Sequence, residues 1–263
     1  MPSAVPRSGL SGPSATNSLE RALVLLELLA RHPDGLTNAE ISRRLHIATS
    51  TSSYILRRLE RWDYVKRDNE TGTYEIGLRV VALAQGALQS LGLRKVVKPM
   101  LHSLVEQTRL TGVVAVLEHG QAMVVERLDT PEFVRVDVAV GARLPVHCTS
   151  LGKVLIANLP KEQLAGIVAD HGLPKRTPKT IVSRTRLLQE LETVRRQGYA
   201  TSEEEHFLGV RAVAAPIVDS TGAVLAAVSA TGLVSQPIWS RPRGVIELVK
   251  TTARDISRRI NGF

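Results

Sequence analysis

The chain of 263 residues is long enough for two domains, one small and one mid-sized. Hydrophobic residues make up 43% but aromatic residues only 3%, so aliphatic side chains must build the cores, and a platform of stacked aromatic rings for bases is disfavoured. A net charge of +9 favours a polyanionic partner such as nucleic acid. The sequence contains no apolar run of about 18 residues, so a membrane span is not expected. A single cysteine cannot form an intramolecular disulfide and favours a reduced, cytoplasmic protein.

The first segments along the chain are an expected disordered tail and a helix. Residues 1–16 are rich in Ser, Pro, Gly and Ala, with too little apolar surface to offset the entropy of ordering them. From Ser18, the sequence SLERALVLLELLARH has the 3.6-residue period of a helix with one buried face. Its apolar positions are Leu23, Leu26 and Ala30 on one stripe, with Leu25 and Leu29 beside it.

The next two helices predict a helix-turn-helix. Thr37 and Glu40 have the spacing of a capping box, which opens a short helix. A turn at His46 and Ile47 leads to a third helix that ends near Asp63, and its polar, basic face is typical of a helix that enters the major groove. The expected contacts with DNA on this helix are Thr49, Ser50, Ser53, Tyr54, Arg57 and Arg58.

A hairpin follows the third helix directly. Residues 64–67 and 73–76 flank a loop that contains Gly72, which is a hairpin signal. In this position the hairpin is expected to be a wing, with Lys66 and Arg67 contacting phosphates. A purely structural lid on the three helices is the alternative. The expected winged helix-turn-helix domain therefore covers residues 17–77.

Residues 78–92 are expected to form a linker helix. Its sequence is so apolar that it needs a partner, which a second copy of the chain can supply. Residues 93–263 then alternate predicted strands and helices, so the fold class is α+β, with an antiparallel sheet flanked by helices. Strands are expected on both sides of His119-Gly120 and at 133–140, 213–218 and 224–231, and helices at 93–108, 151–158, 162–169, 185–197 and 243–260.

Three segments have the residue types of catalytic sites. His147 is adjacent to Cys148, but neighbours in an extended chain point to opposite faces, so His147 is a poor base for the thiol. Gly152-Lys153 lacks the other residues of a P-loop. The acids at 203–205 are more typical of a solvated turn than of acid-base catalysis. The histidines are too far apart for a metal site, so we expect neither an enzyme nor a metal or other cofactor.

Other residues suggest a pocket for a small molecule. Ser229 and Thr231 share one face of a strand, although ordinary strand hydroxyls are an equally good interpretation. Free N–H groups at the helix start at 149–151, or in the loop at Gly141 and Ala142, would suit a carboxylate.

Taken together, five features resemble the IclR family of bacterial transcriptional regulators over residues 18–260. They are SLERALVLLELLA, the winged helix-turn-helix, LPVHCTSLGKVLIANL, GYATSEEEHFLGVRAVAAPIVD and LAAVSATG. The resemblance implies a GAF-like effector-binding and oligomerisation domain at 93–263, a homodimer often paired into a homotetramer, and near-palindromic double-stranded operator DNA. It also implies small organic or aromatic acids as effectors, and no reaction.

The resemblance also implies which residues contact the effector. They match Ser229, Thr231, the loop from Gly141 and Ala142 to Leu144, and two further positions, Ser202 and Ala212. Members that bind small keto acids commonly have Asp and Cys at those last two positions. The pocket of this chain is therefore expected to be roomier and less polar.

The third helix departs from the family pattern as well. Tyr54 stands where Arg is common, and Ser52 takes a position on the buried stripe that usually holds an aliphatic residue. The leading hypothesis is a repressor of a catabolic operon. The alternatives are an activator of the same type, a metabolite-binding protein or enzyme with a DNA-targeting module, and an architectural DNA binder.

Overall fold

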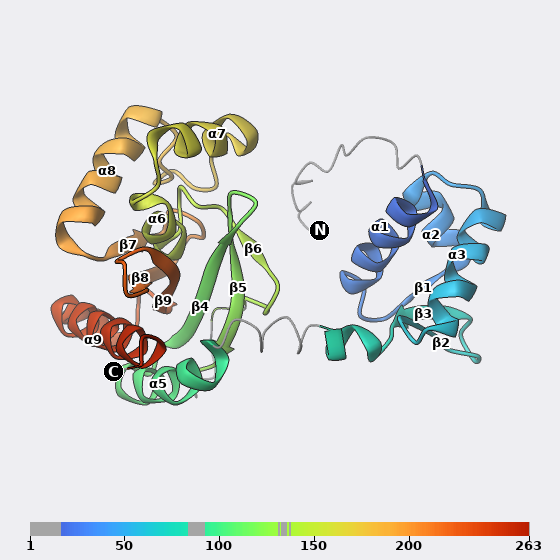
Figure 1. The fold of residues 1–263 in the computed structure, drawn as a ribbon, viewed down its shortest axis with the longest axis horizontal. Helices are drawn as coiled ribbons and strands as arrows, with labels where there is room; N and C mark the ends of the chain where they lie inside the picture. The colour runs from blue at the N-terminus through green and yellow to red at the C-terminus, as the bar shows by residue number, and fades with distance from the viewer. Residues whose placement is uncertain (1–16, 84–92, 131, 133–135, 137, 263) are drawn as a thin grey trace. The chain divides into compact units, whose positions relative to one another are not determined.

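The computed structural model describes residues 17–83, 93–130, 132, 136 and 138–262, and the chain divides into two compact units at Ser90 and Leu91 (Figure 1). The expected tail and the expected linker residues 84–92 lie outside the described residues, whereas 79–83 are helical. The elements of the first unit are α1 (Ser18–Ala30), β1 (Leu36–Thr37), α2 (Asn38–Leu45), α3 (Thr49–Arg61), β2 (Val65–Arg67) and β3 (Thr73–Ile76).

Local sequence signals set the start and end of α2. The Thr37 hydroxyl accepts from the Glu40 N–H at 3.3 Å, and the Glu40 carboxylate accepts from the Thr37 N–H at 2.9 Å, so the predicted capping box is confirmed. His46 then adopts a left-handed conformation with φ of 53°, which ends the helix and begins the turn to α3.

The buried face of α1 differs from the expectation in one respect. Leu25 and Leu29 are fully buried and pack with Ile41, Ile55 and other apolar side chains in the core of this unit. Leu23, expected on the buried face, is 54% exposed, and Ala30 is also exposed. The 3.6-residue period alone does not say which of two adjacent apolar stripes faces the core.

The predicted hairpin forms, and a short strand joins it in a three-stranded antiparallel sheet with the order β1-β3-β2. Gly72, with φ of 73°, and the Asp68 carboxylate, which accepts from the Glu70 N–H at 2.8 Å, shape its loop. Val65 and Tyr74 are buried against the helices, whereas Lys66 and Arg67 are exposed. The hairpin thus closes the core with one face and presents cations on the other.

The second unit contains one six-stranded antiparallel sheet with the order β6-β5-β4-β9-β8-β7. Its elements are α5 (Leu93–Thr108), β4 (Thr111–Glu118), β5 (Gln121–Leu128), β6 (Arg143–Leu144), α6 (Ser150–Ala157), α7 (Lys161–His171), α8 (Arg184–Gln197), β7 (Ala200–Glu203), β8 (Val210–Val218), β9 (Val224–Leu233), the 3₁₀ helix η1 (Pro237–Ser240) and α9 (Pro242–Ile260). Helices α5 and α9 lie side by side against the sheet, and α6 to α8 lie apart from them (Figure 1). The predicted α+β class is confirmed.

The strand expected at 133–140 does not appear in its described part. Residues 133–135 and 137 lie outside the described residues, and 136 and 138–140 are not in a strand. The chain turns there, because the Ala142 N–H donates to the Ala139 carbonyl and Gly141 has φ of 87°. The short strands β6 and β7 were not expected from the sequence, since each is too short to show alternation.

Candidate functional site

The residues expected to contact DNA form one surface of the first unit. It comprises Thr49, Ser50, Ser53, Tyr54, Arg57 and Arg58 from α3, and Lys66 and Arg67 from β2. All of them are exposed except Ser53, which is half-buried. The helix and the hairpin thus offer hydroxyls and cations on side chains that are free to reach a ligand.

Two contacts order this surface. The Arg58 guanidinium lies 4.8 Å from the centre of the Tyr54 ring, so the two side chains stack one helical turn apart. The Ser42 hydroxyl donates to the Ile47 carbonyl at 2.6 Å and lies 3.2 Å from the Thr49 hydroxyl, which ties α2 to the start of α3. The angle between the two helices is therefore stabilised by a buried serine.

In the second unit, one small cavity lies between the sheet, the start of α6 and the loop at 204–209. Its volume is about 50 Å³. The residues that line it are Val113, Val136, Val138, Leu144, Thr149, Ser150, Leu151, Ser202, His206, Phe207, Val210, Ala212 and Thr231. Four of the seven residues expected to contact an effector are among them, namely Leu144, Ser202, Ala212 and Thr231.

The other three expected contact residues do not line this cavity. Ser229 is fully buried, and its hydroxyl lies 3.5 Å from the Val113 carbonyl and 3.4 Å from the Thr231 hydroxyl. The expectation of free N–H groups in the loop is wrong, because the Gly141 N–H donates to Val124 at 2.7 Å and the Ala142 N–H donates within its own turn. An anion cannot use donors that the protein already occupies.

The three catalytic-looking segments come together beside the cavity. Lys153 is 1% exposed, and its ammonium lies 2.6 Å from Glu205 and 2.9 Å from Glu190, and it donates to the Thr201 carbonyl at 3.0 Å. Lys179 forms an ion pair with Glu204. The expectation that the acids form a solvated turn is therefore wrong for Glu204 and Glu205, since both join a network that holds the 204–209 loop.

Gly152 explains why α6 can start where it does. A Cβ atom at Gly152 would lie 2.3 Å from the Val146 Cα atom, so the preceding segment passes directly over the helix. The Thr149 hydroxyl accepts from the Gly152 N–H at 3.1 Å and caps the helix. Gly152 thus allows the backbone at Val146 to approach the helix, and Lys153 places a buried cation next to it.

Cys148 has a histidine neighbour that the sequence did not reveal. Its sulfur lies 3.7 Å from Nδ1 of His206, whereas His147 turns away and donates to the Pro174 carbonyl at 3.2 Å. Burial raises the pKa of the Cys148 thiol to about 12 and lowers the pKa of His206 to about 4. The sulfur keeps its proton at neutral pH, so this pair lacks the thiolate that nucleophilic catalysis requires.

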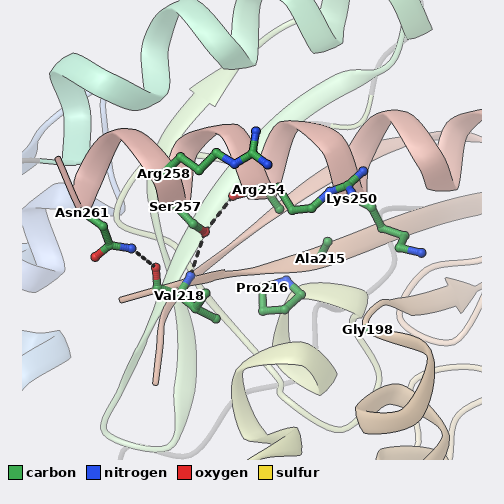
Figure 2. Close-up of a pocket in the computed structure, with 10 residues that line it drawn as sticks. Gly198, Ala215, Pro216, Val218, Lys250, Arg254, Ser257, Arg258 and Asn261 are labelled. Atoms are coloured by element: carbon green, nitrogen blue, oxygen red, sulfur yellow. Dashed lines mark hydrogen bonds between the residues drawn. The ribbon is translucent and has the colours of Figure 1, made fainter. Parts of the chain in front are cut away.

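A second hollow of about 440 Å³ is an open groove between α9 and the outer end of β8 (Figure 2). The Val218 N–H donates to the Ser257 hydroxyl at 3.0 Å, and the Asn261 amide donates to the Val218 carbonyl at 3.2 Å. These bonds satisfy a strand end that extends past β7. Lys250 and Arg254 line the groove, but none of the residues expected to contact an effector does.

Two negative findings concern only the residues that the structure describes. In that part of the chain, no three His, Cys, Asp or Glu side chains are grouped so that they could hold a metal ion. No helix there is long and apolar enough to cross a membrane.

A winged helix-turn-helix in one unit and a small cavity in the other are typical of a DNA-binding regulator with an effector-binding domain. The comparisons identify the family. Residues 18–69 match the IclR helix-turn-helix domain, and residues 85–258 match the C-terminal domain of the bacterial transcriptional regulator IclR. The chain belongs to the IclR family of transcriptional regulators, as its sequence motifs predicted.

Curated relatives support the same conclusion. The HTH-type transcriptional repressor AllR of Salmonella paratyphi A is 34% identical over 254 residues, which is 95% of this chain and 93% of the relative. AllR of Escherichia coli K12 is 33% identical, over 95% of this chain and 94% of the relative. The family and these relatives are transcriptional regulators and not enzymes. Because these curated relatives are named as repressors, the repressor interpretation is also supported.

Solved structures share the fold. An IclR homologue of Microbacterium hydrocarbonoxydans, complexed with 4-hydroxybenzoate, has a TM-score of 0.82 at 27% identity and covers 92% of this chain and 98% of that one. The IclR regulator of Alicyclobacillus acidocaldarius has a TM-score of 0.81 at 26% identity, with 91% and 97% covered.

Proposed function

We propose that this chain represses a catabolic operon as a homodimer or homotetramer, and that a small organic or aromatic acid in the cavity changes its affinity for operator DNA. One observation carries the proposal: four residues at effector-contact positions of the family line the cavity, in a chain whose helix α3 also presents an exposed, basic face. A regulator of this type is located in the cytoplasm, where it binds its DNA and its acid.

The α3 surface supports DNA binding by its chemistry. Arg57 and the Arg58-Tyr54 stack present donors in a form that matches base edges, whereas Lys66 and Arg67 on the hairpin suit phosphates. Contacts of the first kind give sequence preference, and contacts of the second kind give affinity that depends on salt.

The cavity supports an acid of modest size with an apolar body. Its lining is mostly aliphatic, and the first N–H groups of α6, at Ser150 and Leu151, have no acceptor within the helix and suit a carboxylate. A volume of about 50 Å³ is well below the roughly 300–1,000 Å³ of typical ligand pockets. The cavity must therefore enlarge when a ligand binds. We expect Phe207 to move, because it lines the cavity and is 50% exposed.

Self-association is supported by exposed apolar side chains of the first unit. Leu19 is 70% exposed and Leu23 is 54% exposed, one turn apart on α1, and Leu78 is 85% exposed beside the helix at 79–83. Packing against a second copy would remove this surface from water. Two copies would also present two α3 helices to a near-palindromic operator, with half-sites about one helical turn apart.

The proposal is tested by fluorescence anisotropy of the full chain on the DNA upstream of its own gene, at fixed salt, with and without 4-hydroxybenzoate and other monocarboxylic acids. A specific complex whose affinity changes with one acid is expected. Binding that is indifferent to both DNA sequence and acid would leave an architectural DNA binder instead.

Two pairs of variants assign the surfaces. Arg57→Ala should weaken operator binding by about 1–3 kcal/mol and relax sequence preference, whereas Lys161→Ala on α7 should change neither. Thr231→Val should weaken the response to the acid, whereas Thr251→Val, at an exposed position on α9, should not. A wild-type response in Thr231→Val would remove the cavity from the mechanism.

A further inference from the structure

The 204–209 loop is held in place on the scaffold side and exposed at its tip. The Thr177 hydroxyl donates to the Glu204 carbonyl at 2.6 Å, and the Thr180 hydroxyl donates to the Glu205 carbonyl at 2.7 Å. The Lys153 ammonium forms an ion pair with the Glu205 carboxylate at 2.6 Å. Leu208, at the tip, is 66% exposed. The backbone of His206 therefore follows two anchored residues, and the Gly209 N–H, which donates to the Glu204 carboxylate at 2.9 Å, anchors the far end of the loop.

His206 joins this anchored part of the loop to the cavity. Its side chain lines the cavity, and its Nδ1 atom lies 3.7 Å from the buried sulfur of Cys148. Cys148 is held in turn, because its carbonyl accepts from the Ser202 hydroxyl at 2.9 Å. Among the described residues, Nδ1 has Cys148 as its partner and Nε2 has no hydrogen bond, so Nε2 is the nitrogen available to a ligand.

Burial, together with two neighbouring groups, keeps the ring of His206 neutral. Burial is the largest effect, and Arg176 and His147 also disfavour a proton on the ring, which together lower its pKa to about 4. Lys153 adds a positive charge below the loop, and Glu205, the adjacent acid, is paired with that lysine. At neutral pH the imidazole has one N–H group and one free lone pair.

We propose that His206 is a specificity-determining residue, which donates a hydrogen bond from Nε2–H to an acceptor oxygen of the effector while Cys148 donates its S–H to Nδ1. The thiol is the positioning residue, since a donor at Nδ1 selects the tautomer with the proton on Nε2. This inference rests on the proposed function, because it names the chemistry by which the same cavity recognises its acid.

The composition of the wall narrows the class of effector. Among the described residues that line the cavity, none carries a charge at neutral pH, so a second carboxylate would be buried without a cation. His206 and the hydroxyl of Thr231 offer neutral hydrogen bonds beside aliphatic side chains. The structure therefore favours a monocarboxylic acid with an apolar body and a further oxygen acceptor over a dicarboxylic acid.

The first test compares two substitutions at His206 in the full chain, by calorimetric titration with 4-hydroxybenzoate and with whichever acid changes operator binding of the wild type. His206→Phe keeps a ring but loses the donor, and binding of the acid should weaken about tenfold. His206→Gln keeps an N–H donor near the Nε2 position, and binding should return to within about threefold of wild type. Leu208→Ala is the matched control, since it lies in the same loop but does not line the cavity.

The second test does not depend on any acid. Histidine labelled with ¹⁵N distinguishes the two ring tautomers by their chemical shifts, and the His206→Gln spectrum assigns the signal of His206. We expect the Nε2–H tautomer at pH 7, and a shift towards a mixture in Cys148→Ala. A charged ring, or a dominant Nδ1–H tautomer, would overturn the inference.

The two proposals fail in different ways. If an acid alters operator binding equally well in His206→Phe and in wild type, the role of His206 is wrong and the repressor remains. If no acid alters operator binding, the proposed function fails, and the nitrogen signals still decide whether Cys148 sets the tautomer.

Discussion

Two buried polar groups, one in each unit, differ in whether they have hydrogen-bond partners. In the second unit, the buried Lys153 ammonium has two carboxylates and a carbonyl as partners. In the first unit, the Ser52 hydroxyl is fully buried, and no hydrogen-bond partner for it exists among the described residues. A polar group with all its partners is costly to remove, whereas an unpaired one is costly to keep. Removing the polar group should therefore change stability with opposite signs at Lys153 and at Ser52.

The largest expected effect follows loss of the buried ammonium. Lys153→Met should lower the free energy of unfolding of the second unit by about 3–5 kcal/mol, because it leaves Glu205 buried without its cation. Urea denaturation followed by the fluorescence of Trp239, which is 5% exposed, measures this in a Trp62→Phe background. The two tryptophans lie in different units, so the emission of Trp239 reports on the second one.

Two further variants show whether the effect arises from burial of charge. Lys179→Met breaks an ion pair whose lysine is 52% exposed, and should destabilise the unit far less than Lys153→Met does. Combining Lys153→Met with Glu205→Leu removes both charges and should recover at least half of the loss. A double variant as unstable as Lys153→Met would mean that the lysine acts through packing alone.

The second effect is a dependence of stability on pH. Folded His206 takes up a proton only near pH 4, whereas the unfolded residue does so near its ordinary value of 6.5. The unfolded state therefore binds more protons in this window, and His206 lowers the stability of the second unit as pH falls from 6.5 to 4. The change due to His206 should be on the order of 2 kcal/mol, allowing for solvent that reaches the half-buried ring.

The difference between wild type and His206→Gln isolates this contribution. The pKa of His147 is also lowered by burial and acts in the same direction, whereas the raised pKa of Glu205 acts in the opposite one. Both remain in the variant and cancel in the comparison. If the stability of the variant fell as steeply between pH 6.5 and 4 as that of wild type, His206 would not be a neutral buried histidine.

The contrast between the units also explains what the sequence could predict. Tyr54, Arg57 and Arg58 were placed on one face because the period of a single helix fixes their spacing. The Thr37 capping box was equally local. In the second unit, Cys148 and His206 are 58 residues apart, and no local pattern brings them together. Their contact depends on how α6 and the 204–209 loop pack beside one end of the sheet.

The resemblance to a family supplied part of what periodicity could not. It brought Leu144, Ser202, Ala212 and Thr231 together in the expectation, and the structure has them around one cavity. His206 and Phe207 were missed, because the acids before them were interpreted as a solvated turn. A signal for this contact was present in the sequence. Lys153 stands in an apolar helix, and a lysine that is buried there needs an acidic partner, which the run at 203–205 could supply.

The smallest expected effect is a gain of stability in the first unit. Ser52→Ala removes a hydroxyl that is buried without a partner, so the unit should become about 1 kcal/mol more stable. Ser42→Ala is the matched control, since its hydroxyl donates to the Ile47 carbonyl at 2.6 Å, and it should lose a similar amount. Trp62 fluorescence in a Trp239→Phe background reports the transition of this unit. A loss of stability in Ser52→Ala would show that its hydroxyl has a partner in solution, and the contrast between Ser52 and Lys153 would disappear.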